Sequence, residues 1–431
     1  MERTIWFALA AAGGVATLLF AGSLEDIFYV APDHPAIQYA QRPSHDPVAL
    51  LEKRIESGAV KLDYAPNGWG YLPSILKELG VSTDSQVLVF SKTSIQAEHI
   101  NPATPRAIYF NDDVSVGYVQ HGAQLELAAL DPQQGVYFYT LDADRAAKPE
   151  FGRSDDCLRC HQGPTTIGVP GLMISSVRPV VQGAGDGHGN SYLTDDRVSL
   201  ADRWGGWYVT GTTGSQAHLG NNTNLVDPIH PGPPKPEGTE NITSLTDFFD
   251  TSRYLAASSD VVALMTLEHQ TRMTNLMTRI GWDARIALHD DVHQGKLDEA
   301  ARQKIDDEIE EMLVYMLFAD EAPLKDTVSG NSTFTKTFEK RGPRDAQGRS
   351  LRDFDLHTRL FKYPLSYMIY SAEFDGMPEL VRDRVYRRLF EILTGKDQSK
   401  PFERLTTADR TAVLEIVRDT KSGLPAYWSA R

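Results

Sequence analysis

The chain has 431 residues, of which 41% are hydrophobic and 23% are charged, a composition that is ordinary for a soluble globular protein of roughly two or three domains. Its 43 Lys and Arg residues against 58 Asp and Glu residues give a formal net charge of −15. A nucleic-acid-binding protein needs a basic face that displaces counterions from phosphate, so this balance argues against nucleic acid as a partner.

The first 23 residues have the layout of a secretory signal. The basic residue Arg3 precedes an uncharged apolar run over residues 5–21, and small residues follow it before acidic Glu25 and Asp26. This run is short for a membrane span, which takes about 20 residues. We therefore expect residues 1–23 to be a cleaved signal peptide or, alternatively, an uncleaved anchor in the inner membrane, and the protein to be periplasmic or exported.

Residues 24–142 are predicted to contain two helices and then a sheet. Apolar residues at helical spacing indicate helices over 48–57 and 72–79. From residue 86 to residue 142, five runs rich in β-branched and aromatic residues are bounded by Pro, Gly, Asn or Asp: VLVFSKT, AIYFND, VSVGYV, LELAAL and VYFYTL. We expect these runs to form a small antiparallel sheet.

The only two cysteines of the chain follow this sheet, in the sequence Cys157-Leu158-Arg159-Cys160-His161. Cys-x-x-Cys-His is the attachment pattern of c-type haem. Two thiols one short turn apart can form thioethers with the two vinyl groups of one porphyrin, and the adjacent imidazole then binds the iron. The motif predicts one covalent haem c, bound through Cys157 and Cys160, with His161 as the proximal iron ligand.

Three other interpretations of the cysteine pair are weaker. A structural disulfide at this spacing closes a small and strained loop. A thioredoxin-like redox pair is expected beside a βαβ pattern, which the sequence lacks, and a zinc site needs two more ligands, which no second cysteine pair supplies. Export agrees with haem, because c-type haem is attached outside the cytoplasm.

The chain beyond the motif divides into a strand-containing part and a helical part. LMISSVRPVV (172–181) and GGWYVTGT (205–212) are strand candidates, and residues 227–240 form a Pro-rich linker. Ser259 or Asp260 is a candidate cap for a long helix through residue 280, and further helices are expected over 297–319, 378–394 and 405–420. We thus expect an α+β fold, with a mixed α/β haem domain over 24–226 and a helical domain over 241–431.

The ligand on the far side of the iron decides between electron transfer and catalysis. The distal candidates are Met173, which is also a typical core residue, His218 in a glycine-rich stretch, and the pair His269 and Met273, which share one helix face at i and i+4. The aromatic and glycine-rich segment 203–211 fits either a haem contact or a bulged strand in the core. Arg178 and Arg203 are candidates for pairing with haem propionates.

Several strings resemble a family of exported bacterial cytochrome c domain-containing proteins with a single CxxCH. They are CLRCH, RWGGWYVTG, SQAHLGN, LEHQTRM, FDLHTRLFKYPLSYMIYS and GLPAYW, and the likeness runs from about His34 to the C-terminus. The resemblance implies haem binding and electron transfer through Cys157, Cys160 and His161, but no particular substrate. One departure is Thr213, where the family pattern leads us to expect a histidine, and this departure favours His218 as a ligand.

These features predict a c-type cytochrome that passes single electrons between periplasmic partners, among them a redox partner protein. The alternative is a haem enzyme, similar to a peroxidase or oxygenase, whose open distal site is roofed by the helical part. The length of the chain favours the enzyme, since an electron carrier needs only about 100 residues. The lack of a recognisable distal acid and base pair favours the carrier. A haem-based sensor or scaffold is a third class.

Overall fold

A computed structural model of the chain describes residues 30–177, 191–223, 241–291 and 297–429. The predicted signal or anchor at residues 1–23 and the predicted linker at 227–240 lie outside these ranges. Within the described ranges, no helix combines the length and the apolar character that a membrane span requires.

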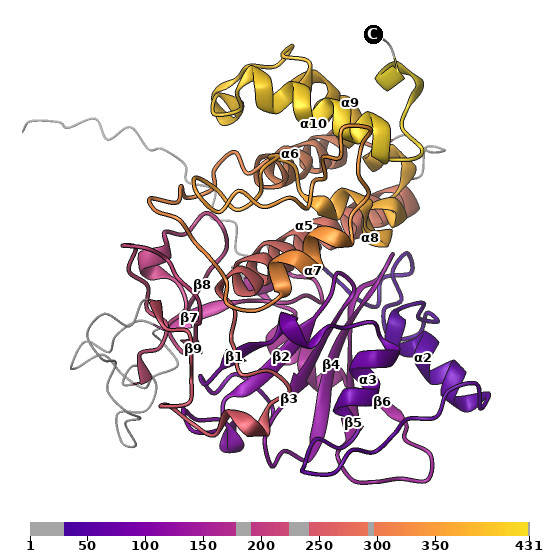
Figure 1. The fold of residues 1–431 in the computed structure, drawn as a ribbon. Coiled ribbons are helices and arrows are strands. Elements are labelled where there is room, and N and C mark those ends of the chain that lie inside the picture. The colour runs from indigo at the N-terminus through magenta and orange to yellow at the C-terminus, as the bar shows by residue number, and fades with distance from the viewer. Residues whose placement is uncertain (1–29, 178–190, 224–240, 292–296, 430–431) are drawn as a thin grey trace, which may run out of the picture.

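A seven-stranded antiparallel sheet forms the N-terminal half, in the order β6-β5-β4-β3-β2-β1-β9 (Figure 1). Its strands are β1 (Val87–Val89), β2 (Arg106–Phe110), β3 (Val114–Tyr118), β4 (Gln124–Asp131), β5 (Gly135–Asp142), β6 (Phe151–Arg153) and β9 (Trp207–Tyr208). The five strands predicted between residues 86 and 142 are confirmed. The segment 205–212 contributes only two residues to the sheet, at its edge beside β1.

Side chains alternate between the two faces of this sheet, as the pleat requires. One face carries Leu127 and Tyr139, and it packs in one cluster with residues of α2 (Pro47–Glu56) and α3 (Leu72–Glu78). The two helices lie over this face in Figure 1. The opposite face carries Leu130, Val136 and Phe138, which form a separate small cluster. A short hairpin of β7 (Ser175–Val177) and β8 (Ser191–Leu193) stands outside the main sheet.

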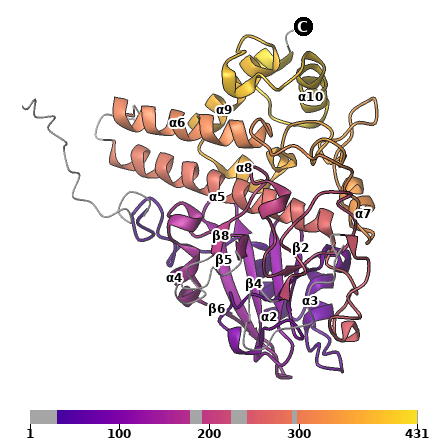
Figure 2. The same ribbon diagram turned by 90° about the vertical axis from the view of Figure 1, so that its left-hand side faces the viewer.

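The C-terminal half is mainly helical and lies over the sheet in two views (Figures 1 and 2). Its helices are α5 (Val261–Asp290), α6 (Glu299–Met316), α7 (Phe334–Lys340), α8 (Ala372–Gly376), α9 (Glu379–Leu393) and α10 (Thr407–Thr420). Asp260 caps α5, as predicted, because its carboxylate accepts hydrogen bonds from the amides of Val262 and Ala263. The four predicted helices are confirmed, and α5 runs ten residues beyond its expected end at 280, to Asp290.

One hydrophobic cluster joins the two halves. It includes Val87 and Val89 of the sheet, Trp207 of β9, and a row of residues along α5. The expected α+β class is therefore confirmed, with an antiparallel sheet first and a mainly helical part after it. The division at residues 226 and 241 stays a prediction, but the parts on either side share a core.

Candidate functional site

The CxxCH motif lies on a short helical segment at the end of the sheet. A 3-10 turn over Asp155–Cys157 leads directly into α4 (Leu158–His161). Residues at positions i, i+3 and i+4 of a helix share one side, so the segment places Cys157, Cys160 and His161 together. Cys157 is half-buried, Cys160 is exposed, and both are free thiols. Figure 2 shows α4 beside β5 and β6.

The imidazole of His161 is held by one of its two nitrogens. Its Nδ1 lies 2.8 Å from the carbonyl oxygen of Gly171. A carbonyl oxygen only accepts hydrogen bonds, so Nδ1 carries the proton, and in the neutral ring Nε2 keeps its lone pair. A hydrogen bond from Nδ1–H to a backbone carbonyl is the usual way that a protein fixes the tautomer and orientation of a metal-binding histidine.

The surroundings of His161 keep its ring neutral. Burial lowers the pKa of His161, and the hydrogen bond to Gly171 offsets only part of that shift. The ring of Phe138 packs at 4.8 Å between centroids and limits its rotation. Burial also raises the pKa of the Cys157 thiol. A neutral imidazole with a free lone pair is the form that binds a metal.

An apolar surface adjoins the motif on the sheet. Ala128 and Leu130 of β4 stand opposite Phe138 and Val136 of β5, and Cys157 packs against this group. Leu158 and Leu172 complete the cluster. Two thiols one helical turn apart, a neutral imidazole and this apolar surface fit the requirements of haem c.

A charged pair on the same sheet face lies close to the motif. Arg106 of β2 and Glu126 of β4 form an ion pair of 2.6 Å, and both charges affect the pKa values of His161 and Cys157. Ser94 and Gln96 also donate hydrogen bonds to the Glu126 carboxylate. Neither Arg106 nor Glu126 was predicted as a site residue from the sequence.

The side chain of Arg106 reaches Glu126 across Gly117 of the intervening strand β3. A Cβ at position 117 would lie 2.7 Å from Nη2 of Arg106 and 2.9 Å from its Nε. Only glycine leaves room for the guanidinium there. A glycine inside a strand pattern often marks such a close approach, so Gly117 was the signal in the sequence for this pair.

His269 and Met273, two of the distal candidates, lie in the interior of the helical part. The Nδ1–H group of His269 donates to Asp196 at 2.8 Å, and its Nε2 accepts from the Ser366 hydroxyl at 2.7 Å. The ring stacks on Phe318 at 4.4 Å. Both nitrogens are engaged, and Met273 is fully buried in the core cluster. Neither residue is brought to the CxxCH motif.

His218 is buried beside the aromatic segment. Its ring meets Trp204 edge-on at 5.3 Å, and a Cβ at Gly220 would lie 2.9 Å from its Nδ1. This environment is formed by the loops next to β9, at the opposite edge of the sheet from β5 and β6, which adjoin the motif. Thr213, where a histidine was expected, is buried and bonds to the Gln216 carbonyl oxygen.

Met173 is the distal candidate that lies nearest to the motif. It follows Leu172, whose backbone forms two hydrogen bonds with the side chain of Asn275 on α5. Met173 is partly exposed and belongs to none of the hydrophobic clusters. However, the Gly171 carbonyl bonds to Nδ1, so the chain at Gly171 passes behind the His161 ring, on the side away from Nε2. A ligand on the far side of the iron would have to come from another direction.

The aromatic segment and Arg203 have structural roles within the described residues. Gly205 and Gly206 allow the backbone to approach Val177 and Ser91 closely. Arg203 is buried and pairs with Glu268 at 3.1 Å, so the expected pairing with a propionate is not supported for it. Arg178 lies outside the described residues.

A hollow on the motif's side of the sheet is roofed by α5. Gln270, Thr271 and Thr274 of α5 face Ala128, Leu130, Val136 and Leu172 across it, and the loop and strand residues Asp112, Asp113, Val114 and Ser115 close one end. Burial, and next the neighbouring Asp112 charge, raise the pKa of the Asp113 carboxyl. A carboxyl group of this kind is a candidate proton donor, and Asp113 was not predicted as one from the sequence.

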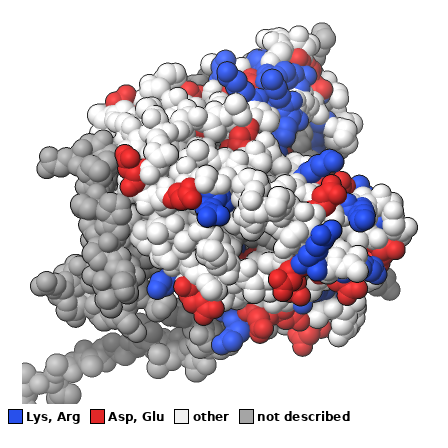
Figure 3. Space-filling view, turned by 60° about the horizontal axis from the view of Figure 1, so that its bottom comes forward, with Lys and Arg blue, Asp and Glu red and all other residues white. Residues whose placement is uncertain are grey.

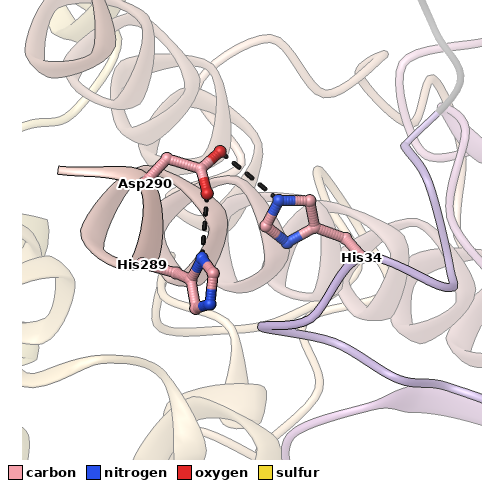
Figure 4. Close-up of side chains that lie close together, drawn as sticks. All are labelled: His34, His289 and Asp290. Carbon is pink, nitrogen blue, oxygen red and sulfur yellow. Dashed lines mark hydrogen bonds and ion pairs between the residues drawn. The ribbon is translucent and has the colours of Figure 1, made fainter. Parts of the chain in front are cut away.

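A second polar cluster joins the N-terminal segment to the end of α5 (Figure 4). The ligand atoms of His34, His289 and Asp290 lie within 4.8 Å of one another. His34 Nε2 and His289 Nδ1 both contact the Asp290 carboxylate, at 3.3 Å and 2.9 Å, while His34 Nδ1 accepts a hydrogen bond from the amide of Ala36. Each histidine therefore directs an N–H group at the carboxylate, and this pattern satisfies the cluster without a metal ion.

No family model, no curated protein and no solved structure matches this chain.

Proposed function

We propose that the chain is a c-type cytochrome that carries one covalent haem and transfers single electrons in the periplasm. Cys157 and Cys160 form the thioethers, and His161 is the proximal iron ligand. The observation that carries the proposal is the hydrogen bond between His161 Nδ1 and the Gly171 carbonyl, within a CxxCH motif. It leaves Nε2 as the only nitrogen of that ring with a free lone pair.

The bound haem would supply a one-electron redox couple. The chain's own residues hold and shield it. Leu158 and Phe138 offer apolar contact, and the Gly171 carbonyl keeps the imidazole oriented. The ion pair of Arg106 and Glu126 places one positive and one negative charge near the iron ligand, so it would influence the reduction potential of the haem.

Export belongs to the same proposal. Residues 1–23 would direct the chain to the periplasm, either as a cleaved signal or as an anchor in the inner membrane. The partner would be a redox protein rather than nucleic acid. Acidic and basic side chains are interspersed on the face shown in Figure 3, with broad uncharged areas between them. Transient electron-transfer contacts use small interfaces, so such a mixed face is compatible with one.

A haem enzyme with an open distal site is the second candidate, and one observation favours it. Among the described residues, His269 and Met273 are fixed in the helical core, and a hollow containing Asp113 lies under α5 beside the apolar cluster. The hollow holds only about 20 Å³, room for one small molecule such as water, but a carboxyl group of raised pKa such as Asp113 is the kind of proton donor that peroxidase- or oxygenase-like chemistry uses.

Reduced optical spectra with and without carbon monoxide separate the two candidates. The chain is produced together with haem-maturation machinery, and its spectrum is recorded before and after addition of the gas. An unchanged spectrum supports a six-coordinate electron carrier, whereas a prompt shift supports the open site of an enzyme. Single substitutions of Met173 and His218, the two distal candidates that are not fixed in the helical core, then test for a sixth ligand, because loss of that ligand changes the spin state.

A further inference from the structure

A cavity of about 580 Å³, open to solvent on one side, lies at the end of α5. Four segments that are distant in the sequence form its wall: the N-terminal segment, the turn between β4 and β5, the last turns of α5, and the connection from α8 to α9. The residues that line it are Ala36, Arg42, Gln133, Arg285, Leu288, His289, Asp375, Gly376, Met377, Pro378 and Arg382. A volume of this size accommodates a small organic molecule.

Three arginines from three of these segments face this cavity. Arg285 donates to the carbonyl oxygens of Gln133 at 2.9 Å and Gly376 at 2.7 Å. Arg382 donates to the carbonyl oxygens of Asp375 and Met377, and Arg42 to that of Ala36. Backbone carbonyls thus orient all three guanidinium groups. Among the described residues, none of the three lies within ion-pair distance of a carboxylate.

The carboxyl groups around these arginines are engaged elsewhere. Asp375 lines the cavity, but its carboxylate accepts from Lys421 at 2.6 Å. Asp131 accepts from the amides of His45, Gln133 and Gln134. Burial raises the pKa of Glu373 well above its usual range, and this carboxyl accepts a hydrogen bond from the Thr278 hydroxyl, while Asp290 is bound by His34 and His289. Asp131 and Glu373 attract Arg285 only at longer range, and no carboxylate of the described residues forms an ion pair with any of the three arginines.

The position of Arg285 makes its positive charge less favourable than in water. Burial, and next the charge of Arg42, lower the pKa of Arg285 to about 10. Arg285 still carries its charge at neutral pH, but its burial and the neighbouring Arg42 make that charge costly. An anion in the cavity would remove that cost. A planar guanidinium pairs with carboxylate or phosphate oxygens through two parallel hydrogen bonds, which makes arginine the residue best suited to both groups.

We propose that this cavity binds a small organic anion with at least two negative charges, carried by carboxylate or phosphate groups. Arg42, Arg285 and Arg382 are its ligands. The site is separate from the haem motif, since none of Cys157, Cys160 and His161 lines the cavity. It would give an acidic electron-transfer protein or haem enzyme a specific small-molecule ligand.

Isothermal titration of the purified full chain tests the proposal, with citrate and pyrophosphate as separate probes at constant ionic strength. We expect saturable binding of at least one of them. Citrate alone indicates a carboxylate ligand, and pyrophosphate alone indicates a phosphorylated one. Arg42→Gln and Arg382→Gln should each weaken binding about tenfold, because each removes a charged hydrogen-bond donor. Arg285 is left unchanged, since its hydrogen bonds tie α5 to the distant segments of Gln133 and Gly376 and its loss would also disturb the fold.

The matched control is Arg384→Gln. Arg384 lies on α9 two residues from Arg382, but it pairs with Asp306 of α6 and does not line the cavity. The Arg384→Gln variant loses the same single charge as the two test variants but keeps every residue that lines the cavity. Its affinity for the probe should therefore stay within about twofold of that of the parent. Failure of both probes to bind at millimolar concentration would overturn the proposal. Equal weakening by Arg384→Gln, or no weakening by Arg42→Gln and Arg382→Gln, would overturn it as well.

Discussion

Two histidines, His161 on α4 and His269 on α5, lie beside aromatic rings and differ in the use of their nitrogens. His269 donates from Nδ1 to Asp196 and accepts at Nε2 from Ser366, and it is completely buried. His161 donates from Nδ1 to a backbone carbonyl and is only partly buried, and Nε2 keeps its lone pair. An available lone pair, rather than burial or aromatic contact, distinguishes a candidate ligand from a structural histidine.

The largest expected effect is the loss of covalent haem when the two cysteines next to His161 are replaced. The double substitution Cys157→Ser and Cys160→Ser should abolish covalent haem, because no other thiol exists in the chain. Haem staining after denaturing electrophoresis shows whether covalent haem remains on the chain. Arg159→Gln, between the two cysteines, is the control and should retain the stain. Equal staining of the double variant and the parent would exclude thioether attachment at this motif.

Replacing His269 should destabilise the fold strongly without affecting haem attachment. His269→Ala removes one hydrogen-bond partner from each of Asp196 and Ser366 and opens a cavity between Phe318 and Tyr315. We expect a loss of about 3–5 kcal/mol in the free energy of unfolding, measured in urea. His357→Ala, at an exposed histidine, should change it by less than about 0.5 kcal/mol. A loss below about 1 kcal/mol at His269 would contradict its structural role.

The helical core around His269 should also give stability a pH dependence. Burial, and then the Asp196 charge, raise the pKa of Glu321 from 4.5 to about 8. The folded chain then holds a proton that the unfolded chain has lost, so this contribution is complete below pH 4.5 and disappears as the pH rises to about 8.

Glu321→Gln removes this titration and keeps an oxygen that accepts from the Leu360 amide. Relative to the parent, the variant should gain at least about 1 kcal/mol in unfolding free energy between pH 5 and pH 8. Urea unfolding at both pH values measures the difference. Parallel pH profiles of the two proteins would show that Glu321 is not the titrating group.

The smallest change in unfolding free energy is expected from a substitution on the sheet face near His161. Gly117→Ala places a methyl group against the Arg106 guanidinium and displaces it from Glu126. We expect a loss of about 1 kcal/mol in unfolding free energy. Gly152→Ala in β6 is the control, because the nearest atom to its new Cβ is Thr140 Oγ1 at 3.2 Å. A Gly117→Ala variant no less stable than Gly152→Ala would argue against a fixed Arg106 position.

The sequence predicted the regular elements well, because their signals are local. Alternating β-branched residues defined the strands from residue 87 to residue 142, and Asp260 marked the start of α5. Two short helices, α7 and α8, were missed because so few residues give a weak periodic signal, whereas α3, as short as α7, was predicted from its apolar spacing. The end of α5 was placed early because Gly281 interrupts the pattern, whereas tertiary packing carries the helix through it.

The candidate site was predictable only in its local part. Cys157, Cys160 and His161 are adjacent in the sequence, so the motif identified them together. The partners of His161 come from Gly171, Phe138 and the pair of Arg106 and Glu126, whose proximity depends on strand order. The shared helix face of His269 and Met273 was inferred correctly, but periodicity does not reveal which neighbours that face meets.

The intact mass of the denatured chain tests the central claim most directly. The protein is produced with haem-maturation machinery, unfolded in acid so that non-covalent ligands dissociate, and weighed by mass spectrometry. The account predicts the mass of the mature chain plus one haem, with the added mass on the peptide that contains Cys157 and Cys160. A mass equal to that of the unmodified chain would contradict it.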